Sequence, residues 1–183
     1  LAVGEVCNMI GVVVAVPVSR RLGKRKTFGL AGVLLAVLSI AFFFVPCTNA
    51  GFILMLLLQI LISICTGIVS PLVWSMYADV ADYARVKDGS SSTGLIFSSG
   101  SMAQKFGGAI AGSAVLWLFA AFGLVPNAAS QTESAILGMK LTMSWIPAAI
   151  ALLMVFIMVV YPLTKSKMKE IGRQLVSLQR VED

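Results

Sequence analysis

Long apolar segments alternate along this chain with short polar ones. Five apolar segments cover residues 1–18, 27–45, 52–76, 93–124 and 137–163. Because about 20 apolar residues in a helix cross a hydrocarbon core roughly 30 Å thick, each segment is predicted to span a membrane once. The pattern therefore predicts an all-α membrane fold, a polytopic helical bundle with about five transmembrane helices within residues 1–163.

Two features modify this simple pattern. The segment 93–124 is too long for one perpendicular crossing, so its helix is expected to be tilted or to extend beyond the membrane. Pro71 and Pro147 lie inside the third and fifth segments. Each is expected to kink its helix, because proline removes a backbone hydrogen bond.

The polar segment that follows residue 163 is a basic tail, residues 164–183. Its apolar residues recur at helical spacing, at Met168, Ile171, Leu175 and Leu178. Apolar positions interleaved in this way with basic ones indicate a short amphipathic helix on the inner leaflet of the membrane. A frayed and solvated tail is the alternative.

The distribution of basic residues predicts the topology. Five basic residues lie in the loop 19–26, two lie in the loop around residues 77–92 and five lie in the tail, whereas the loops 46–51 and 125–136 contain none. Cytoplasmic loops carry an excess of Lys and Arg, so the basic side is predicted to be cytoplasmic. Five crossings then place the N-terminus outside and the C-terminus in the cytoplasm.

The composition narrows the class of function. The chain is 58% hydrophobic and 12% charged, whereas soluble domains contain about 25% charged residues. The net charge of +6 follows from the basic loops and needs no nucleic acid to explain it. Histidine is absent, and the three cysteines form no CxxC pair. We therefore expect neither an enzyme nor a bound cofactor or metal.

Lys105 is the only charged residue in the segment 93–124. A lysine at the centre of a membrane helix costs roughly 2.5–3.5 kcal/mol on insertion scales, so it usually faces a polar interior. Helical spacing places it on a stripe of small and polar residues with Ser98, Ser101, Gly108 and Gly112. The stripe indicates a substrate or cation pathway. An ion pair that only locks two helices is the alternative, and Glu5 is a candidate partner.

A second group of charged residues follows the third apolar segment. It comprises Asp79, Asp82, Tyr83, Arg85, Lys87 and Asp88. Asp79 and Asp82 are three residues apart, so both can face one side of a helix. Two carboxylates at a membrane boundary, close to cytoplasmic arginines, suggest a salt-bridge gate that opens and closes one side of a transporter. A solvated helix end is the alternative.

These motifs together resemble a known family. The runs Met76-Tyr-Ala-Asp-Val-Ala-Asp-Tyr83, Thr93-Gly94-Leu95 and Gln104-Lys105-Phe106-Gly107 are similar to those of the glycoside–pentoside–hexuronide cation symporters, in the major facilitator superfamily. Val125-Pro126-Asn127, Leu137-Gly138 and Tyr161-Pro162-Leu163 resemble the last loop and last helix of that family. The resemblance covers nearly the whole chain and corresponds to helices eight to twelve of the twelve-helix fold, that is, to its C-terminal half.

The resemblance implies a secondary active transporter of the bacterial inner membrane, driven by sodium or protons and carrying a sugar, glycoside or hexuronide. It implies that Lys105 borders the sugar and cation sites, with Ser101, Gln104 and Ser98 near the same pathway. It also implies that Asp79, Asp82, Tyr83 and Arg85 belong to a cytoplasmic gate. The expected partners are the substrate, the coupling cation, the lipid bilayer and the N-terminal helices of the same transporter.

The chain departs from the family pattern at Ser90 and Ser91, where family members often carry arginine. The resemblance therefore does not imply a gate that depends on those arginines. Arg85 stands where an acidic residue is common in the family, so it can supply the positive charge from another position. The alternative function is a non-transporting membrane scaffold or sensor built on the same bundle.

Overall fold

The computed structural model describes residues 2–46, 48–89, 92–126, 128 and 130–182 of the chain. Its seven helices are α1 (Ala2–Leu22), α2 (Lys24–Phe43), α3 (Asn49–Asp88), α4 (Thr93–Ala121), α5 (Glu133–Met143), α6 (Trp145–Val160) and α7 (Lys165–Glu182). The described part of the chain contains no strand. The expected all-α membrane fold is thus confirmed.

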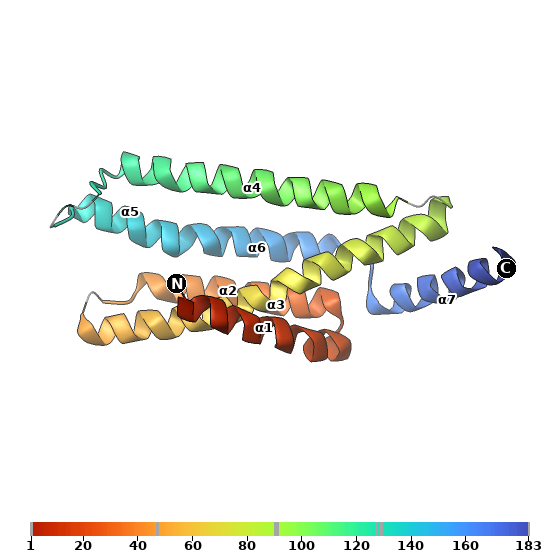
Figure 1. The fold of residues 1–183 in the computed structure, drawn as a ribbon. Helices are drawn as coiled ribbons and strands as arrows, with labels where there is room; N and C mark the ends of the chain where they lie inside the picture. The colour runs from red at the N-terminus through yellow and green to blue at the C-terminus, as the bar shows by residue number, and fades with distance from the viewer. Residues whose placement is uncertain (1, 47, 90–91, 127, 129, 183) are drawn as a thin grey trace.

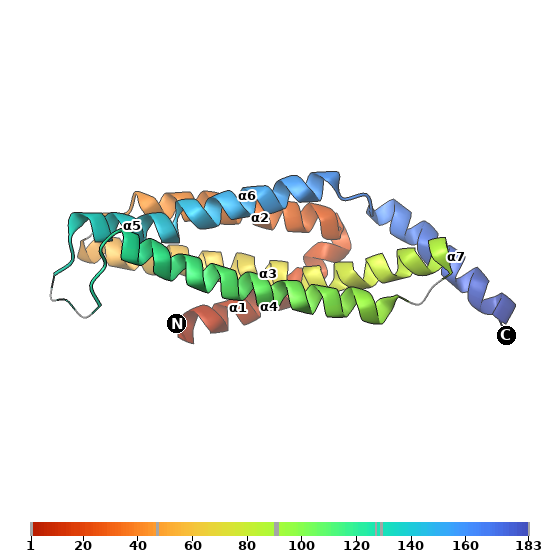
Figure 2. The ribbon, with the colours of Figure 1, turned by 90° about the horizontal axis from the view of Figure 1, so that it is seen from above.

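The helices form an elongated bundle (Figure 1). α2 packs against both α3 and α6, and α1 packs along α3. The turn between α1 and α2, the end of α3 and the whole of α7 lie at one end of the molecule, in both Figure 1 and the perpendicular view of Figure 2. The three basic segments of the sequence therefore gather at one end, as the topology prediction requires.

Three helical segments of the described chain are long and apolar enough to cross a membrane, namely Lys24–Phe43, Gly51–Asp88 and Glu133–Val160. The first and fourth predicted spans form the helices α1 and α4, which run beside these segments (Figure 1). α1 and α4 are less uniformly apolar, because α1 contains Glu5 and Asn8 and α4 contains Gln104, Lys105 and several glycines and serines.

The packing of α1 against α3 depends on two glycines. A Cβ atom on Gly11 would collide with the carbonyl oxygen of Ile64, and one on Gly67 would collide with the carbonyl oxygen of Asn8. Both glycines are buried. Small residues let two membrane helices approach backbone to backbone, where dispersion contacts hold them together. The crossing of α1 and α3 is therefore as close as two helices allow.

Two apolar clusters hold α2 against its neighbours. Alanines form the first one, with Ala36, Ala148 and Ala151 joining α2 to α6. Phe28, Leu72 and Met76 form the second, with partly buried residues of α6 packed around it. The second cluster fixes the beginning of α2, which carries three of the five basic residues of the segment 19–26, against the middle of α3.

α3 is much longer than the predicted span 52–76. Its 40 residues correspond to about 60 Å, roughly twice the thickness of a hydrocarbon core. The helix continues through Pro71 and ends only at Asp88, where Gly89 adopts a left-handed conformation with φ of 66°. Most of the segment 77–92, which the sequence suggested as a loop, is therefore helical.

The fifth predicted span is divided into α5 and α6. Pro147 has no backbone N–H to donate to the carbonyl of Met143, so the first helix ends at that residue. Ser144 lies in the break, fully buried, and its hydroxyl donates to the carbonyl oxygen of Lys140 at 2.5 Å. The sequence predicted a kink at Pro147, whereas the structure divides the span into two helices just before this residue.

α4 is attached to the bundle near its two ends. Near its beginning, Gly100 lies against the ring of Tyr77, and Phe97 stacks on Trp74 with ring centroids 6.1 Å apart. Just beyond its other end, the ring of Phe122 lies against Gly138 of α5. Most of the residues between these two contacts are exposed. The basic tail forms α7, which confirms the helix predicted there, and α7 packs against the end of α3 with Ile171 only 4% exposed.

Candidate functional site

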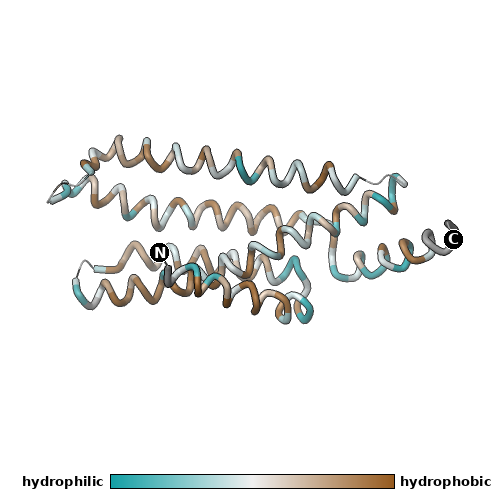
Figure 3. The backbone as a smooth tube through the Cα atoms, viewed as in Figure 1, coloured by the Kyte–Doolittle hydropathy of each residue, from teal (hydrophilic) through white to brown (hydrophobic). Residues whose placement is uncertain are grey.

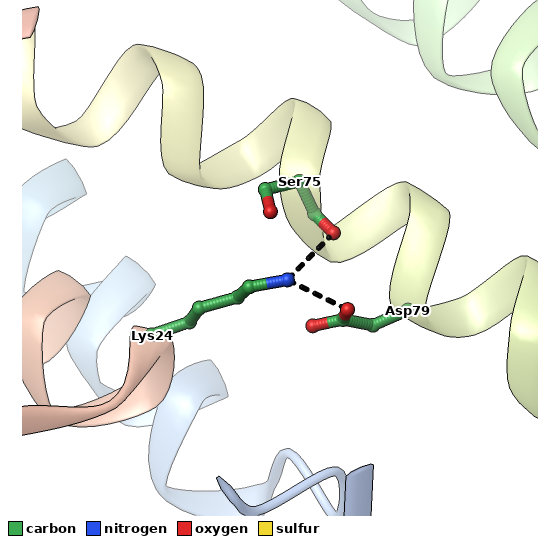
Figure 4. A network of polar contacts seen from close by, with 3 residues as sticks. All are labelled: Lys24, Ser75 and Asp79. Carbon is green, nitrogen blue, oxygen red and sulfur yellow. Dashed lines mark hydrogen bonds and ion pairs between the residues drawn. The ribbon is translucent and has the colours of Figure 1, made fainter. Parts of the chain in front are cut away.

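An ion pair joins α2 to α3 at the basic end of the bundle. The ammonium of Lys24 lies 2.6 Å from Oδ1 of Asp79 and donates a second hydrogen bond, 3.2 Å long, to the carbonyl oxygen of Ser75 (Figure 4). The carboxylate side chain is only 12% exposed and the lysine side chain 35%. The pair is therefore partly shielded from water, and losing one partner would leave a poorly solvated charge.

The turn before α2 explains why Lys24 reaches α3. Gly23 has a φ of 87°, a left-handed conformation that favours glycine, and it lets the chain reverse direction between α1 and α2. The next residue, Lys24, then begins α2 directly beside α3. Arg25 is fixed as well, since its guanidinium donates to the carbonyl oxygens of Met158 and Val159 at the end of α6.

The structure separates the two carboxylates that the sequence grouped together. Asp79 is buried and paired with Lys24, whereas Asp82 is exposed. Three residues along a helix correspond to a rotation of about 300°, so the two side chains share a face only partly. The sequence suggested cytoplasmic arginines as partners of the carboxylates, whereas the partner of Asp79 is a lysine of the segment 19–26.

Tyr83 and Arg85 lie further along the exposed end of α3. The ring of Tyr83 lies under two ammonium groups, Lys87 at 5.8 Å and Lys167 at 5.5 Å from the ring centroid. Since Lys167 belongs to α7, this contact helps to attach α7 to α3. Arg85 is exposed at the same end. Ser90 and Ser91, the positions of the missing arginines, lie outside the described residues.

A buried phenol lies near the Lys24–Asp79 pair. Tyr161 packs against the cluster of Phe28, Leu72 and Met76, and its hydroxyl is buried with no hydrogen-bond partner in the described part of the chain. Burial, and then the negative charge of Asp79, raise the pKa of Tyr161 to about 12. The hydroxyl is therefore a hydrogen-bond donor without a partner in the described part of the chain.

Lys105 projects from the exposed middle of α4. Its ammonium has no hydrogen-bond or ion-pair partner among the residues that the structure describes, and Gln104 is exposed beside it. Figure 3 shows a hydrophilic stretch at this point of an otherwise apolar or neutral helix. Glu5 is also exposed, and the two charges form no ion pair within the described chain. The structure therefore offers no helix-locking partner for Lys105.

The predicted stripe lies on the outward side of α4. The inward side borders an apolar cavity of about 660 Å³ between α4 and the helices α2, α3 and α6, lined on α4 by Gly107, Ala111, Ala114 and Leu118 among others. At about 100° per residue, Lys105 is rotated by about 160° from this row. Ser98 and Ser101 are bound to their own helix, to the carbonyl oxygens of Leu95 and Phe97.

The site residues that the sequence named thus fall into two separate places. Asp79, Asp82, Tyr83 and Arg85 lie at the basic end of α3, whereas Ser98, Ser101 and Lys105 lie along the outward side of α4. Gln104 precedes Gly107 and Ala111 by three and seven residues, so it continues the row that borders the apolar cavity. Two residues of the first place were missed, Lys24 and Tyr161. The charge of Lys24 was visible only as part of a basic loop, and Tyr161 was visible only in the family resemblance. No group of three His, Cys, Asp or Glu side chains in the described chain could hold a metal ion.

Known proteins resemble this chain over most of its length. Residues 1–165 match the family described as MFS/sugar transport protein. An uncharacterized 29.9 kDa protein in the crtE 3' region of Pseudescherichia vulneris is 34% identical over 162 residues, which are 88% of this chain and 58% of that protein. The glucuronide carrier protein homolog of Escherichia coli (strain K12) is 31% identical over 96% of this chain, and the inner membrane symporter YicJ of the same strain is 30% identical over 94%. No solved structure matches the chain.

The chain belongs to the MFS/sugar transport protein family, a family of membrane transport proteins. This confirms the resemblance to facilitators of the glycoside–pentoside–hexuronide type that its motifs predicted. The chain spans 58% of the length of the first relative and 38% and 37% of the other two.

Proposed function

We propose that this chain is the C-terminal part of a secondary active transporter that carries a sugar, glycoside or hexuronide together with a cation, Na⁺ or H⁺. The observation that carries the proposal is the position of Lys105. It lies in the middle of α4, which runs beside the candidate membrane spans, on the side that turns away from the packed bundle, without a partner in the described chain. Membership of a transport family explains an unpaired charge at this position, because the substrate pathway of a facilitator lies between its two helical halves.

The geometry supports a pathway role for the outward stripe of α4. A lone ammonium in a membrane is costly unless it faces water, substrate or a carboxylate. The small residues Gly108 and Gly112 beside it leave open space, because a Cβ atom on either would meet nothing within 4 Å. In the complete transporter we expect the stripe to face the other helical half across the substrate cavity, with Ser101 as a further polar contact on the stripe and Gln104 on the adjacent face of α4.

The Lys24–Asp79 pair supports a second part of the proposal, a gate at the cytoplasmic end. It links two helices by a short, partly shielded interaction, and a change of conformation can break it and form it again. Asp82, Tyr83 and Arg85 lie further along the same helix and would belong to the mobile surface around the gate. Orientation follows from the basic residues, which favour the cytoplasm.

Counterflow tests the proposal against the alternative of a non-transporting scaffold or sensor. Full-length protein in vesicles is loaded with unlabelled glycoside, and entry of labelled glycoside, pentoside or hexuronide is followed. A transporter exchanges the two pools without a cation gradient, whereas a scaffold or sensor does not. Imposed sodium and pH gradients, applied separately, then distinguish Na⁺ coupling from H⁺ coupling.

Lys105→Ala is the sharpest variant for this proposal. We expect normal abundance in the membrane, because removing a charge makes insertion easier, together with strongly reduced accumulation of sugar against a gradient. Lys140→Ala is the matched control, since Lys140 is a half-buried lysine of α5 away from the stripe. Accumulation at the unsubstituted level, with unchanged dependence on the cation, would remove the main support for a pathway along α4.

A further inference from the structure

A pocket at the basic end of the bundle has an unusual excess of positive charge. It has a volume of about 530 Å³, which is within the size range of small-molecule sites. Six basic side chains line it, and Asp79 is the only acidic one. The six are Arg20, Lys24, Arg25, Lys26, Lys165 and Lys169. Since Asp79 is already paired with Lys24, the pocket keeps a formal excess of five positive charges.

The backbone adds to this positive potential. α2 and α7 both begin at the pocket, and neither has an acidic residue in its first turn. The N-terminus of a helix carries a partial positive charge, so basic side chains there are opposed by the helix dipole. The basic side chains at the start of α2 and α7 are therefore repelled by the helix dipoles and by one another. An anion bound between them would reduce this repulsion.

Three of the six basic groups are already held in place by the protein. Lys24 is fixed by Asp79 and Ser75, Arg25 by the last carbonyls of α6, and Lys165 donates to the carbonyl oxygens of Arg20 and Arg21 at 2.7 and 3.3 Å. Carbonyl oxygens orient a cation without cancelling its charge. The cationic side chains of the pocket are thus preorganised. Binding of an anion there costs little side-chain conformational entropy.

We propose that this pocket binds a phosphate group, and that the phosphate belongs to the headgroup of an anionic phospholipid. A lipid is the favoured source because the pocket is not polar throughout: Leu163 and Met168 also line it, and Leu163 is 6% exposed. Basic pockets where helices leave the cytoplasmic side of a membrane suit such headgroups. The lipid source rests on the cytoplasmic orientation proposed above, whereas the phosphate site itself does not.

The test uses two basic residues that line the pocket and two that do not. Lys26 and Lys169 are exposed lining residues, so the double variant K26Q/K169Q removes two charges without disturbing the core. The double variant K87Q/R173Q removes two charges from α3 and α7 outside the lining. Native mass spectrometry of the full-length protein, offered equal amounts of phosphatidylglycerol and phosphatidylcholine, measures retained lipid. Lipid retention is measured without a transport assay. The result therefore tests the phosphate pocket independently of the proposed transport function.

We expect retention of phosphatidylglycerol over phosphatidylcholine, and a loss of about tenfold or more in K26Q/K169Q. K87Q/R173Q should stay within about twofold, and the charge-preserving K26R/K169R should restore retention. Equal losses in the two glutamine pairs would overturn the proposal, because they would show general attraction to a basic surface. Equal retention of the two lipids would also overturn it.

A competition arm separates the two sources of phosphate. Sodium phosphate and sodium chloride are compared at equal ionic strength. If the lipid headgroup is the ligand, millimolar inorganic phosphate displaces little phosphatidylglycerol. Displacement by phosphate but not chloride, abolished in K26Q/K169Q, would support the same pocket with a free phosphate as its ligand and would reject the lipid.

Discussion

At the residue scale, burial distinguishes groups that look alike in the sequence. Asp79 and Asp82 occupy the same motif, yet one is buried against Lys24 and the other is exposed. Serines along α4 bond to their own backbone, whereas Lys105 beside them has no partner in the described chain. Function at this scale therefore depends on which polar groups the fold leaves available.

The carboxylates should respond differently to neutralisation. Asp79→Asn leaves the ammonium of Lys24 without its counter-charge in a partly shielded place, so we expect a loss of about 1–3 kcal/mol in stability and slower transport. Asp82→Asn, at an exposed position, should change stability by less than about 0.5 kcal/mol. Thermal unfolding in detergent and initial uptake rates measure both. Equal effects of the two substitutions would contradict the role assigned to the pair.

The double variant Lys24→Gln with Asp79→Asn provides the control. If the ion pair is the cause, the double variant should be less destabilised than the sum of the two single variants, because neither charge is left alone. Purely additive losses would indicate that each side chain contributes through other contacts.

Tyr161 gives a prediction about alkaline pH. Its pKa in the folded protein is about 12, above the ordinary value of 10. Between these values the unfolded state has released the phenolic proton and the folded state has not, so stability falls as pH rises from about 10 to 12. Tyr161→Phe lacks this proton and also removes an unpaired buried hydroxyl. Chemical unfolding at pH 8 and pH 11 should show a smaller drop in the variant, and an equal drop would contradict the assignment.

At the element scale, close packing is concentrated where α1 crosses α3 and where α2 meets α6. Gly11 and Gly67 lie at the first crossing, and alanines fill the second. α4, in contrast, is attached near its two ends and leaves its middle free. The bundle thus combines tightly packed helices with one helix whose central surface is available to another part of the protein.

Substitution of the crossing glycines should separate the helices. Gly11→Ala or Gly67→Ala places a methyl group against a carbonyl oxygen of the facing helix, so each should cost about 1–3 kcal/mol. Gly29→Ala is the control, because a Cβ atom there meets nothing within 4 Å, and alanine is favoured over glycine in helices. Thermal unfolding of the full-length protein compares them. A control variant as unstable as the crossing variants would refute the packing argument.

Hydrophobic length and periodicity were sufficient to predict helices in all five apolar segments and in the tail, and three helical segments of the described chain are long and apolar enough to cross a membrane. Two features needed the structure. The segment 77–92 looked like a loop because it is polar, yet it continues α3, since charged residues are compatible with a helix that runs beyond the membrane. The partner of Asp79 was missed because Lys24 lies 55 residues away in the sequence, and no local pattern specifies which helices become neighbours.

At the scale of the whole molecule, one end is basic and the other is not. The α1–α2 turn, the end of α3 and α7 lie together, while the α2–α3 and α4–α5 connections lie at the opposite end (Figure 1). Two proposals depend on this polarity, the cytoplasmic position of the gate and the lipid source of the phosphate in the basic pocket. The orientation of the bundle is therefore the property to test first.

Two serine positions give a matched labelling experiment. Ser166 lies in α7 at the basic end, Ser134 lies in α5 at the other end, and both are exposed. In intact cells, a membrane-impermeant thiol reagent should label Ser134→Cys and spare Ser166→Cys, and permeabilisation should expose both. Strong labelling of Ser166→Cys in intact cells would reverse the orientation.

The crossing of α1 and α3 also determines when α1 can form its contacts during synthesis of the chain. Gly11 and Gly67 are separated by 56 residues, with the whole of α2 between them. At synthesis rates of about 5–20 residues per second, α1 waits roughly 3–11 s for the surface that it packs against. During that interval α3 does not yet cover the glycine groove of α1. α1 therefore acquires this neighbour only after α2 has been made, and a ribosome that slows over α2 would prolong the period in which this face of α1 remains open to a wrong partner.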